Sequence, residues 1–156
     1  MGRFRTHNPG ALIREARLDF DISQAELARR ADLAESVIAE MESGVLSVDP
    51  DMLERVLQAA DYRPNVALKR CYAEIRQEAA RRDLRNVRIF GSVALGDDGF
   101  DSDIDLLVTP GKGTTAFDIA NFVDCVRQIT GFPADVIVDT KPFPPGWTAA
   151  EEAVPL

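Results

Sequence analysis

The chain has 156 residues, of which 46% are apolar and 28% charged, enough for one ordinary domain or two small ones with a hydrophobic core. Its net charge of -8 argues against non-specific nucleic-acid binding, which depends mainly on Lys and Arg. The single histidine, His7, and two isolated cysteines, Cys71 and Cys125, exclude histidine-centred catalysis and zinc sites and predict reduced thiols. Without an apolar run that could form a membrane span or a signal peptide, we expect a cytoplasmic protein with no membrane contact.

Helical signals fill the first part of the chain, residues 1–65. Apolar spacing predicts a first helix around Leu12 and a third over residues 34–42 that ends before Gly44. Ser23 and Glu26 have the spacing of a capping box, and Asp49 with Pro50 is typical of a helix start. These signals predict a compact bundle of short helices.

The stretch ISQAELARRADLAESVIAEMESG, residues 22–44, resembles the helix-turn-helix domains of the Xre/Cro family. The Ser-Gln-x-x-Leu-Ala opening, Ile38 and the Glu-x-Gly ending fall in the family's register. The resemblance implies that the helix over residues 34–42 lies in the major groove of operator DNA. It implies further that Gln24 contacts phosphate and that Glu35, Ser36 and Glu40 face base edges.

The charge of this segment departs from the family's pattern. Neither Lys nor Arg occurs between Ala31 and Glu54, so nothing basic there would hold the DNA backbone. Ala34 also occupies the position where the family usually has a capping Ser or Thr. Two interpretations therefore stay open: operator binding through residues 23–44, or a protein-docking or structural role.

The second part, residues 66–156, changes from helical to mixed periodicity. A long helix with basic outer faces is expected over residues 66–85, either as a solvated face or as a cationic wall beside a phosphate-bearing ligand. Short β-branched runs then predict strands over residues 87–90, 103–108 and 134–138, with a helix over residues 115–130 before the last. This alternation predicts an α/β layer structure. A Pro-rich turn and one helical turn follow, with Trp147 as a packing anchor.

The stretch GSVALGDDGFDSDIDLLV, residues 91–108, carries the chemistry. Asp103 and Asp105 stand two positions apart in a predicted strand, so both side chains project to the same side, where they repel unless a cation lies between them. Mg2+ takes one or two carboxylates together with substrate phosphates. Gly91 allows close approach of the backbone to a ligand, and Ser92 opens a helix whose N–H groups attract phosphate. Asp135 begins the next strand and can share a metal ion or accept a proton.

This arrangement resembles the DNA-polymerase-beta-like nucleotidyltransferase superfamily, and residues 67–156 resemble its minimal nucleotidyltransferase (MNT) family through GSVALG, SDIDLLV, DVIV and EEAVPL. The resemblances together imply a two-domain α+β chain with a helix-turn-helix bundle before an α/β domain that has a small mixed sheet. They also imply transfer of AMP from ATP with two Mg2+ ions. Asp103, Asp105 and Asp135 are the expected catalytic and metal-binding residues, and Gly91 with Ser92 would bind the nucleotide.

The MNT resemblance further implies an antitoxin that modifies a tyrosine of a HEPN-type ribonuclease toxin, and the helix-turn-helix part fits autoregulation of its operon. The first alternative is a DNA-binding regulator that neutralises its toxin by binding alone, without turnover. Transfer to a small molecule such as an aminoglycoside is the weaker alternative, because the chain lacks the extra domain expected to shape such a pocket. A homo-oligomer is compatible with the sequence.

Overall fold

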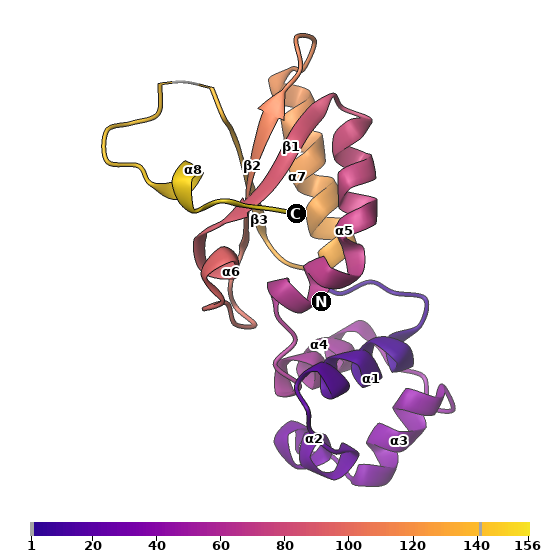
Figure 1. Cartoon of the computed structure of the whole chain (residues 1–156). Coiled ribbons are helices and arrows are strands. Elements are labelled where there is room, and N and C mark those ends of the chain that lie inside the picture. The colour runs from indigo at the N-terminus through magenta and orange to yellow at the C-terminus, as the bar shows by residue number, and fades with distance from the viewer. Residues whose placement is uncertain (1, 141) are drawn as a thin grey trace.

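The computed structural model describes residues 2–140 and 142–156, which form a helical part and an α/β part (Figure 1). The helical part contains α1 (Pro9–Asp19), α2 (Gln24–Ala31), α3 (Glu35–Ser43) and α4 (Pro50–Ala59). The long helix α5 (Pro64–Ala80) then leads into a four-stranded mixed sheet. This arrangement confirms the predicted fold class, while the boundary between residues 65 and 66 stays a prediction.

The helix starts of the first part follow the local sequence. The side chains of Asn8, Ser23 and Asp49 each accept a hydrogen bond from the first turn of α1, α2 and α4. The capping box is only half formed, because the Glu26 carboxylate pairs with Arg29 and Arg30 instead of returning to Ser23. Ala34 occupies the N-cap position of α3 and provides no side-chain hydrogen bond, as its sequence predicts.

A buried ion pair ties the first three helices together. The Arg17 Nε donates to Glu42 Oε1 over 2.6 Å, and the two side chains are 12% and 5% exposed. Gln24 Nε2 donates to the other carboxylate oxygen over 2.9 Å. Separation of these three helices would leave a buried charge without its partner, which is costly. The contact therefore favours one packing arrangement of α1, α2 and α3.

The sheet has the strand order β3-β2-β1-β4. It is built from β1 (Leu84–Phe90), β2 (Ile104–Pro110), β3 (Ala134–Val138) and the short β4 (Val154–Pro155). Strands β2 and β3 are parallel, whereas β1 is antiparallel to both β2 and β4.

Several element boundaries differ from expectation, and the tail contains a strand that was not expected. Helix α5 ends at Ala80 instead of residue 85, because the chain reverses through Asp83 in the left-handed region at φ 53° and strand β1 already begins at Leu84. Asp103 precedes β2 instead of belonging to it. The tail forms the expected helical turn, α8 (Ala149–Glu152), and in addition supplies β4.

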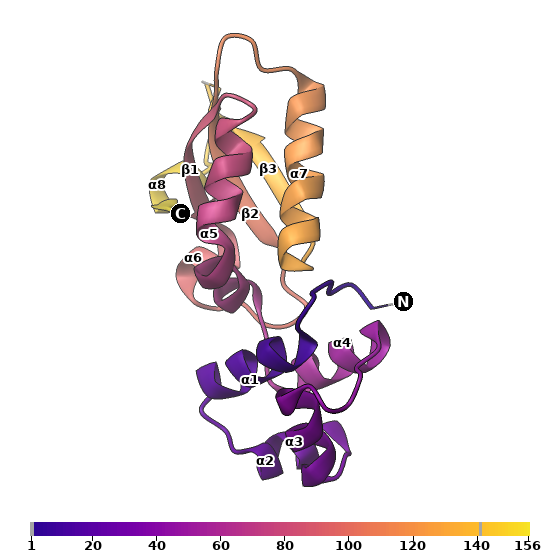
Figure 2. The same ribbon diagram turned by 90° about the vertical axis from the view of Figure 1, so that its right-hand side faces the viewer.

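Helices α5 and α7 (Ala116–Thr130) lie side by side on one face of the sheet (Figure 2). Ile104, Leu106 and Val108 point into this layer and are fully buried. Asp105 alternates with them and therefore projects from the other face. Helix α5 packs on the face of the sheet opposite to Asp105, which favours a solvated face for most of its basic residues, and the alternative of a cationic wall beside a phosphate-bearing ligand stays a prediction.

The C-terminal tail partly covers the face that carries Asp105. Trp147 packs edge-on against Phe90 with ring centroids 5.8 Å apart, and its ring lies 4.6 Å from that of Phe143. Trp147 is thus the packing anchor that the sequence predicts. The thiols of Cys71 and Cys125 are both free, and His7 is exposed. Over the described residues, the helices are too short or too polar to cross a membrane.

Candidate active site

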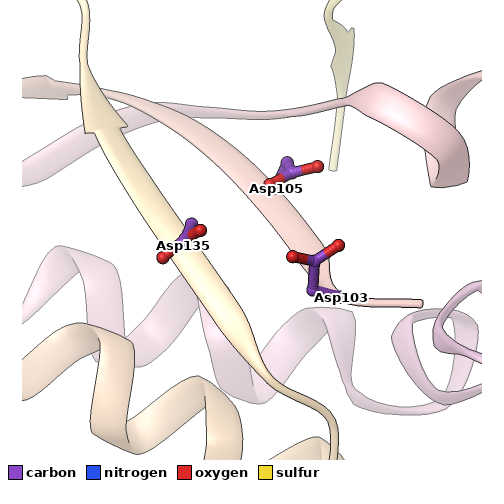
Figure 3. A group of neighbouring side chains, drawn as sticks. All are labelled: Asp103, Asp105 and Asp135. Carbon is purple, nitrogen blue, oxygen red and sulfur yellow. The ribbon is translucent and has the colours of Figure 1, made fainter. Parts of the chain in front are cut away.

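Two neighbouring strands bring three carboxylates to one face of the sheet. Asp105 on β2 is in register with Asp135 on the parallel strand β3, and Asp103 immediately precedes β2. One oxygen atom from each side chain lies within 4.8 Å of the others. Figure 3 shows the three groups projecting on the same side of these strands. We call Asp103, Asp105 and Asp135 the acidic cluster.

In the part of the chain that the structure describes, no basic side chain pairs with the acidic cluster. Burial, together with the charges of Asp103 and Asp135, raises the pKa of Asp105 above its usual value of 3.8. Within residues 2–140 and 142–156, no ion pair or hydrogen bond involves the three carboxylates. Hard oxygen ligands at this spacing fit a divalent cation such as Mg2+, which would remove the repulsion.

Gly91 lies directly against Asp105. It follows Phe90, which is in register with Asp105, and it adopts φ +70°. A Cβ atom at position 91 would lie 2.4 Å from Asp105 Oδ2, so only glycine leaves this carboxylate in place. Ser92 is the next residue in the short helix α6 (Gly91–Leu95). Gly91 therefore borders the acidic cluster, and the nucleotide-binding role expected for Gly91 and Ser92 stays a prediction.

A tight turn delivers Asp103 to the cluster. The Gly99 N–H donates to Ser102 Oγ, and the Ser102 N–H donates back to the Gly99 carbonyl. The buried carboxylate of Asp98 accepts from the Asn65 N–H at the start of α5 over 2.7 Å. The turn before Asp103 is thereby attached to the rest of the molecule by its own polar groups.

The residues expected to contact DNA lie in the helical part, away from the acidic cluster. Glu35, Ser36 and Glu40 are exposed on α3. Gln24 is half-buried, and its amide donates to Glu42. That contact uses one of the two N–H groups of the Gln24 amide, and the predicted contact of Gln24 with phosphate stays a prediction.

Sequence reasoning missed a polar group on the same sheet face as the acidic cluster. Asp139 Oδ2 accepts from Arg88 Nη2 and from Thr109 Oγ1, each over 2.6 Å. Arg88 is in register with Leu107, one alternation along β2 from Asp105. The signal in the sequence was Arg88 at an alternate position of a predicted strand, which places it on the opposite face from the basic helix.

Comparison with known proteins agrees with both parts of the chain. Residues 13–66 match a family model described as helix-turn-helix, and residues 72–147 match one described as nucleotidyltransferase domain. A solved structure described as a minimal nucleotidyltransferase is 31% identical, with a TM-score of 0.53; the match covers 59% of this chain and 95% of that one. None of the curated proteins matches significantly. The chain thus belongs to the minimal nucleotidyltransferase family and carries a helix-turn-helix unit in front of the transferase fold.

Proposed function

We propose that this protein is an antitoxin that transfers AMP from ATP to a tyrosine hydroxyl of a HEPN-type ribonuclease toxin. The observation that carries the transferase assignment is the convergence of Asp103, Asp105 and Asp135 beside Gly91. Family membership supports nucleotidyl transfer, and the antitoxin role and the protein acceptor are inferred from the resemblance of the motifs.

In the proposed site, Asp103, Asp105 and Asp135 would hold the two Mg2+ ions that the family resemblance implies. Bound Mg2+ would neutralise triphosphate charge and make the acceptor hydroxyl more acidic. Gly91 leaves room beside Asp105, and the first N–H groups of α6 are offered to phosphate oxygens. This helix has only five residues, so the contribution comes from individual N–H groups more than from a helix dipole.

The transfer forms a bond between the acceptor oxygen and the α-phosphorus and breaks the bond from that phosphorus to pyrophosphate. The acceptor must lose its proton in the same step. Asp135 lies on the edge strand β3 and its carboxylate is exposed, so we assign it as the proton acceptor in addition to its proposed role as a metal ligand. Pyrophosphate leaves with the electron pair of the broken bond.

The test is co-expression with the product of the neighbouring gene, followed by intact-mass measurement of that partner. The unaltered chain should add one or several AMP units to the partner. The double variant Asp103→Asn/Asp105→Asn should add none. Asp101→Asn is the matched control, because Asp101 is exposed in the same segment and lies outside the acidic cluster. Labelling by the double variant at the control's level would contradict the proposal.

A second candidate is a DNA-binding regulator that neutralises its toxin by binding alone, and the helix-turn-helix match favours it. Exposed Glu35 and Glu40 on α3 would either accept from cytosine amino groups or repel phosphates. Gel-shift measurements on the operator distinguish these two effects of the carboxylates. Glu35→Gln with Glu40→Gln lowers specific affinity if the carboxylates read bases and raises it if they only repel DNA.

A further inference from the structure

The segment before the first helix lies between the two parts of the molecule. Gly2 packs so closely that a Cβ atom there would be 2.0 Å from the Pro50 carbonyl oxygen at the start of α4. Phe4 is 3% exposed, and its ring fills the space that a side chain at Gly131 would need. We call residues 2–8 the lead-in. It precedes both family-model matches, which begin at residues 13 and 72.

Arg3 is the residue of the lead-in that contacts both parts. On the helical side, its backbone N–H donates to Glu54 Oε2 over 2.9 Å, and its Nε lies 3.4 Å from Glu54 Oε1. On the transferase side, its Nη2 donates to the Phe100 carbonyl over 2.7 Å. The guanidinium carbon lies 4.2 Å from the centre of the Phe100 ring and 5.0 Å from that of Phe132.

The two aromatic residues that flank Arg3 lead directly into the acidic cluster. The sequences are Phe100-Asp-Ser-Asp103 and Phe132-Pro-Ala-Asp135, so each aromatic ring stands at the same spacing before its carboxylate. The rings of Phe100 and Phe132 touch edge to face at 6.3 Å. The two segments also join where the Ile104 N–H donates to the Pro133 carbonyl over 2.8 Å. Arg3 therefore connects the segments that lead into β2 and β3, the two strands of the acidic cluster.

Several contacts of different kinds hold the Arg3 guanidinium in one place. It faces two aromatic rings, donates to the Phe100 carbonyl and lies beside the Glu54 carboxylate. The three carboxylates stand on or next to two strands, so the spacing of these strands decides whether all three can reach one cation. A fixed anchor where both strands begin holds that spacing.

We infer that Arg3 is a positioning residue of the transferase site, which sets the distance of Asp103 from Asp135. It does so by connecting the segments that precede β2 and β3 to Glu54 of the helix-turn-helix unit. The inference rests on the proposed function only for the metal that the cluster would hold. Arg3 acts through Phe100 and Phe132 and is not assigned a contact with substrate.

The test compares full-length Arg3→Met and Arg3→Lys with the control Arg5→Met, which alters an exposed arginine of the same lead-in. The first measurement is the amide NMR shift of Asp103 and Asp135 in metal-free protein. The second is the dissociation constant for Mn2+ alone, at a temperature where circular dichroism shows every variant folded. Arg3→Met should shift both amides and weaken Mn2+ binding about 10-fold, as loss of outer supporting contacts does. Arg3→Lys, which keeps the charge, should recover part of the affinity.

Two results overturn the inference: unchanged amide shifts in Arg3→Met, or an equal loss of Mn2+ affinity in Arg5→Met. Failure of the proposed metal site looks different, because the unaltered chain would then bind Mn2+ no better than Asp103→Asn/Asp105→Asn. In that case the amide shifts in metal-free protein still decide whether Arg3 positions the two segments. Partial recovery by Arg3→Lys together with shifted amides in Arg3→Met supports the inference.

Discussion

Replacement of Gly91 by alanine is expected to disable the acidic cluster without unfolding the protein. The new Cβ atom would lie 2.4 Å from Asp105 Oδ2, whereas Cβ atoms essentially never come nearer than 3.0 Å to another heavy atom. The Asp105 carboxylate must therefore move by more than half an ångström, about 0.6 Å at the least. Because a misplacement of 1 Å costs about 10²-fold in rate, we expect kcat/KM for transfer to fall at least about 10-fold.

Backbone strain accompanies this collision and must be separated from it. Alanine in the left-handed region costs roughly 1–2 kcal/mol, and Gly91 has φ +70°. Gly96, at the other end of α6, has φ +76° and no atom within 4 Å of its Cβ position. Gly96→Ala is thus the matched control, since it adds the same strain and no collision.

Urea denaturation should give similar losses of stability for Gly91→Ala and Gly96→Ala. Mn2+ titration and transfer of labelled AMP to the partner should be impaired in Gly91→Ala alone. If Gly91→Ala binds Mn2+ and transfers AMP as well as Gly96→Ala does, then the position of the Asp105 carboxylate does not control the site and the reasoning is refuted.

Three further outcomes are expected. Burial and the charges of Asp103 and Asp135 raise the pKa of Asp105, so metal-free protein loses stability as pH rises through that pKa. Asp105→Asn should therefore raise the Tm at pH 7 by about 2 °C. MgCl2 should raise the Tm of the unaltered chain and leave that of Asp105→Asn unchanged. Glu42→Ala should lower the free energy of unfolding by about 3–5 kcal/mol in urea titrations, because Arg17 is left buried without its partner. Burial opposes ionisation of Glu42, but hydrogen bonds from its partners hold its pKa below 4.5, so this stabilisation should persist at neutral pH and disappear as pH falls below 4.5.

The elements that carry the acidic cluster were predictable because their signals are local. Alternation places Asp103 and Asp105 on one side of the chain whatever lies elsewhere in the fold, and the apolar neighbours Ile104 and Leu106 identify the buried side. Parallel pairing of β2 with β3 then puts Asp135 beside Asp105. The assignment of metal and catalytic roles to these residues stays a prediction, since geometry alone does not test it.

The ends of elements were less predictable, because a single backbone conformation decides them. The long helix was expected to continue to residue 85, since its composition stays favourable, but Asp83 turns the chain at φ 53° after Ala80. Strand β4 has only two residues, and its pairing with Arg88 and Ile89 comes from tertiary contact, which no periodicity of the tail reports.

Sequence patterns do not report contacts between residues that are far apart in the chain, such as those of Arg3. Arg3 and Phe100 are separated by 97 positions, and Arg3 belongs neither to a periodic segment nor to the motif around Asp103. Taken alone, an arginine next to a phenylalanine in a polar lead-in is typical of a solvated terminus, whereas in the fold it joins α4 to the approaches of two strands. A motif therefore identifies the groups that do the chemistry, while residues that fix the spacing of those groups come from wherever the chain folds back. In this protein, Arg3 connects the segments before β2 and β3 to Glu54 of α4, which gives the two parts a shared structural basis for the site.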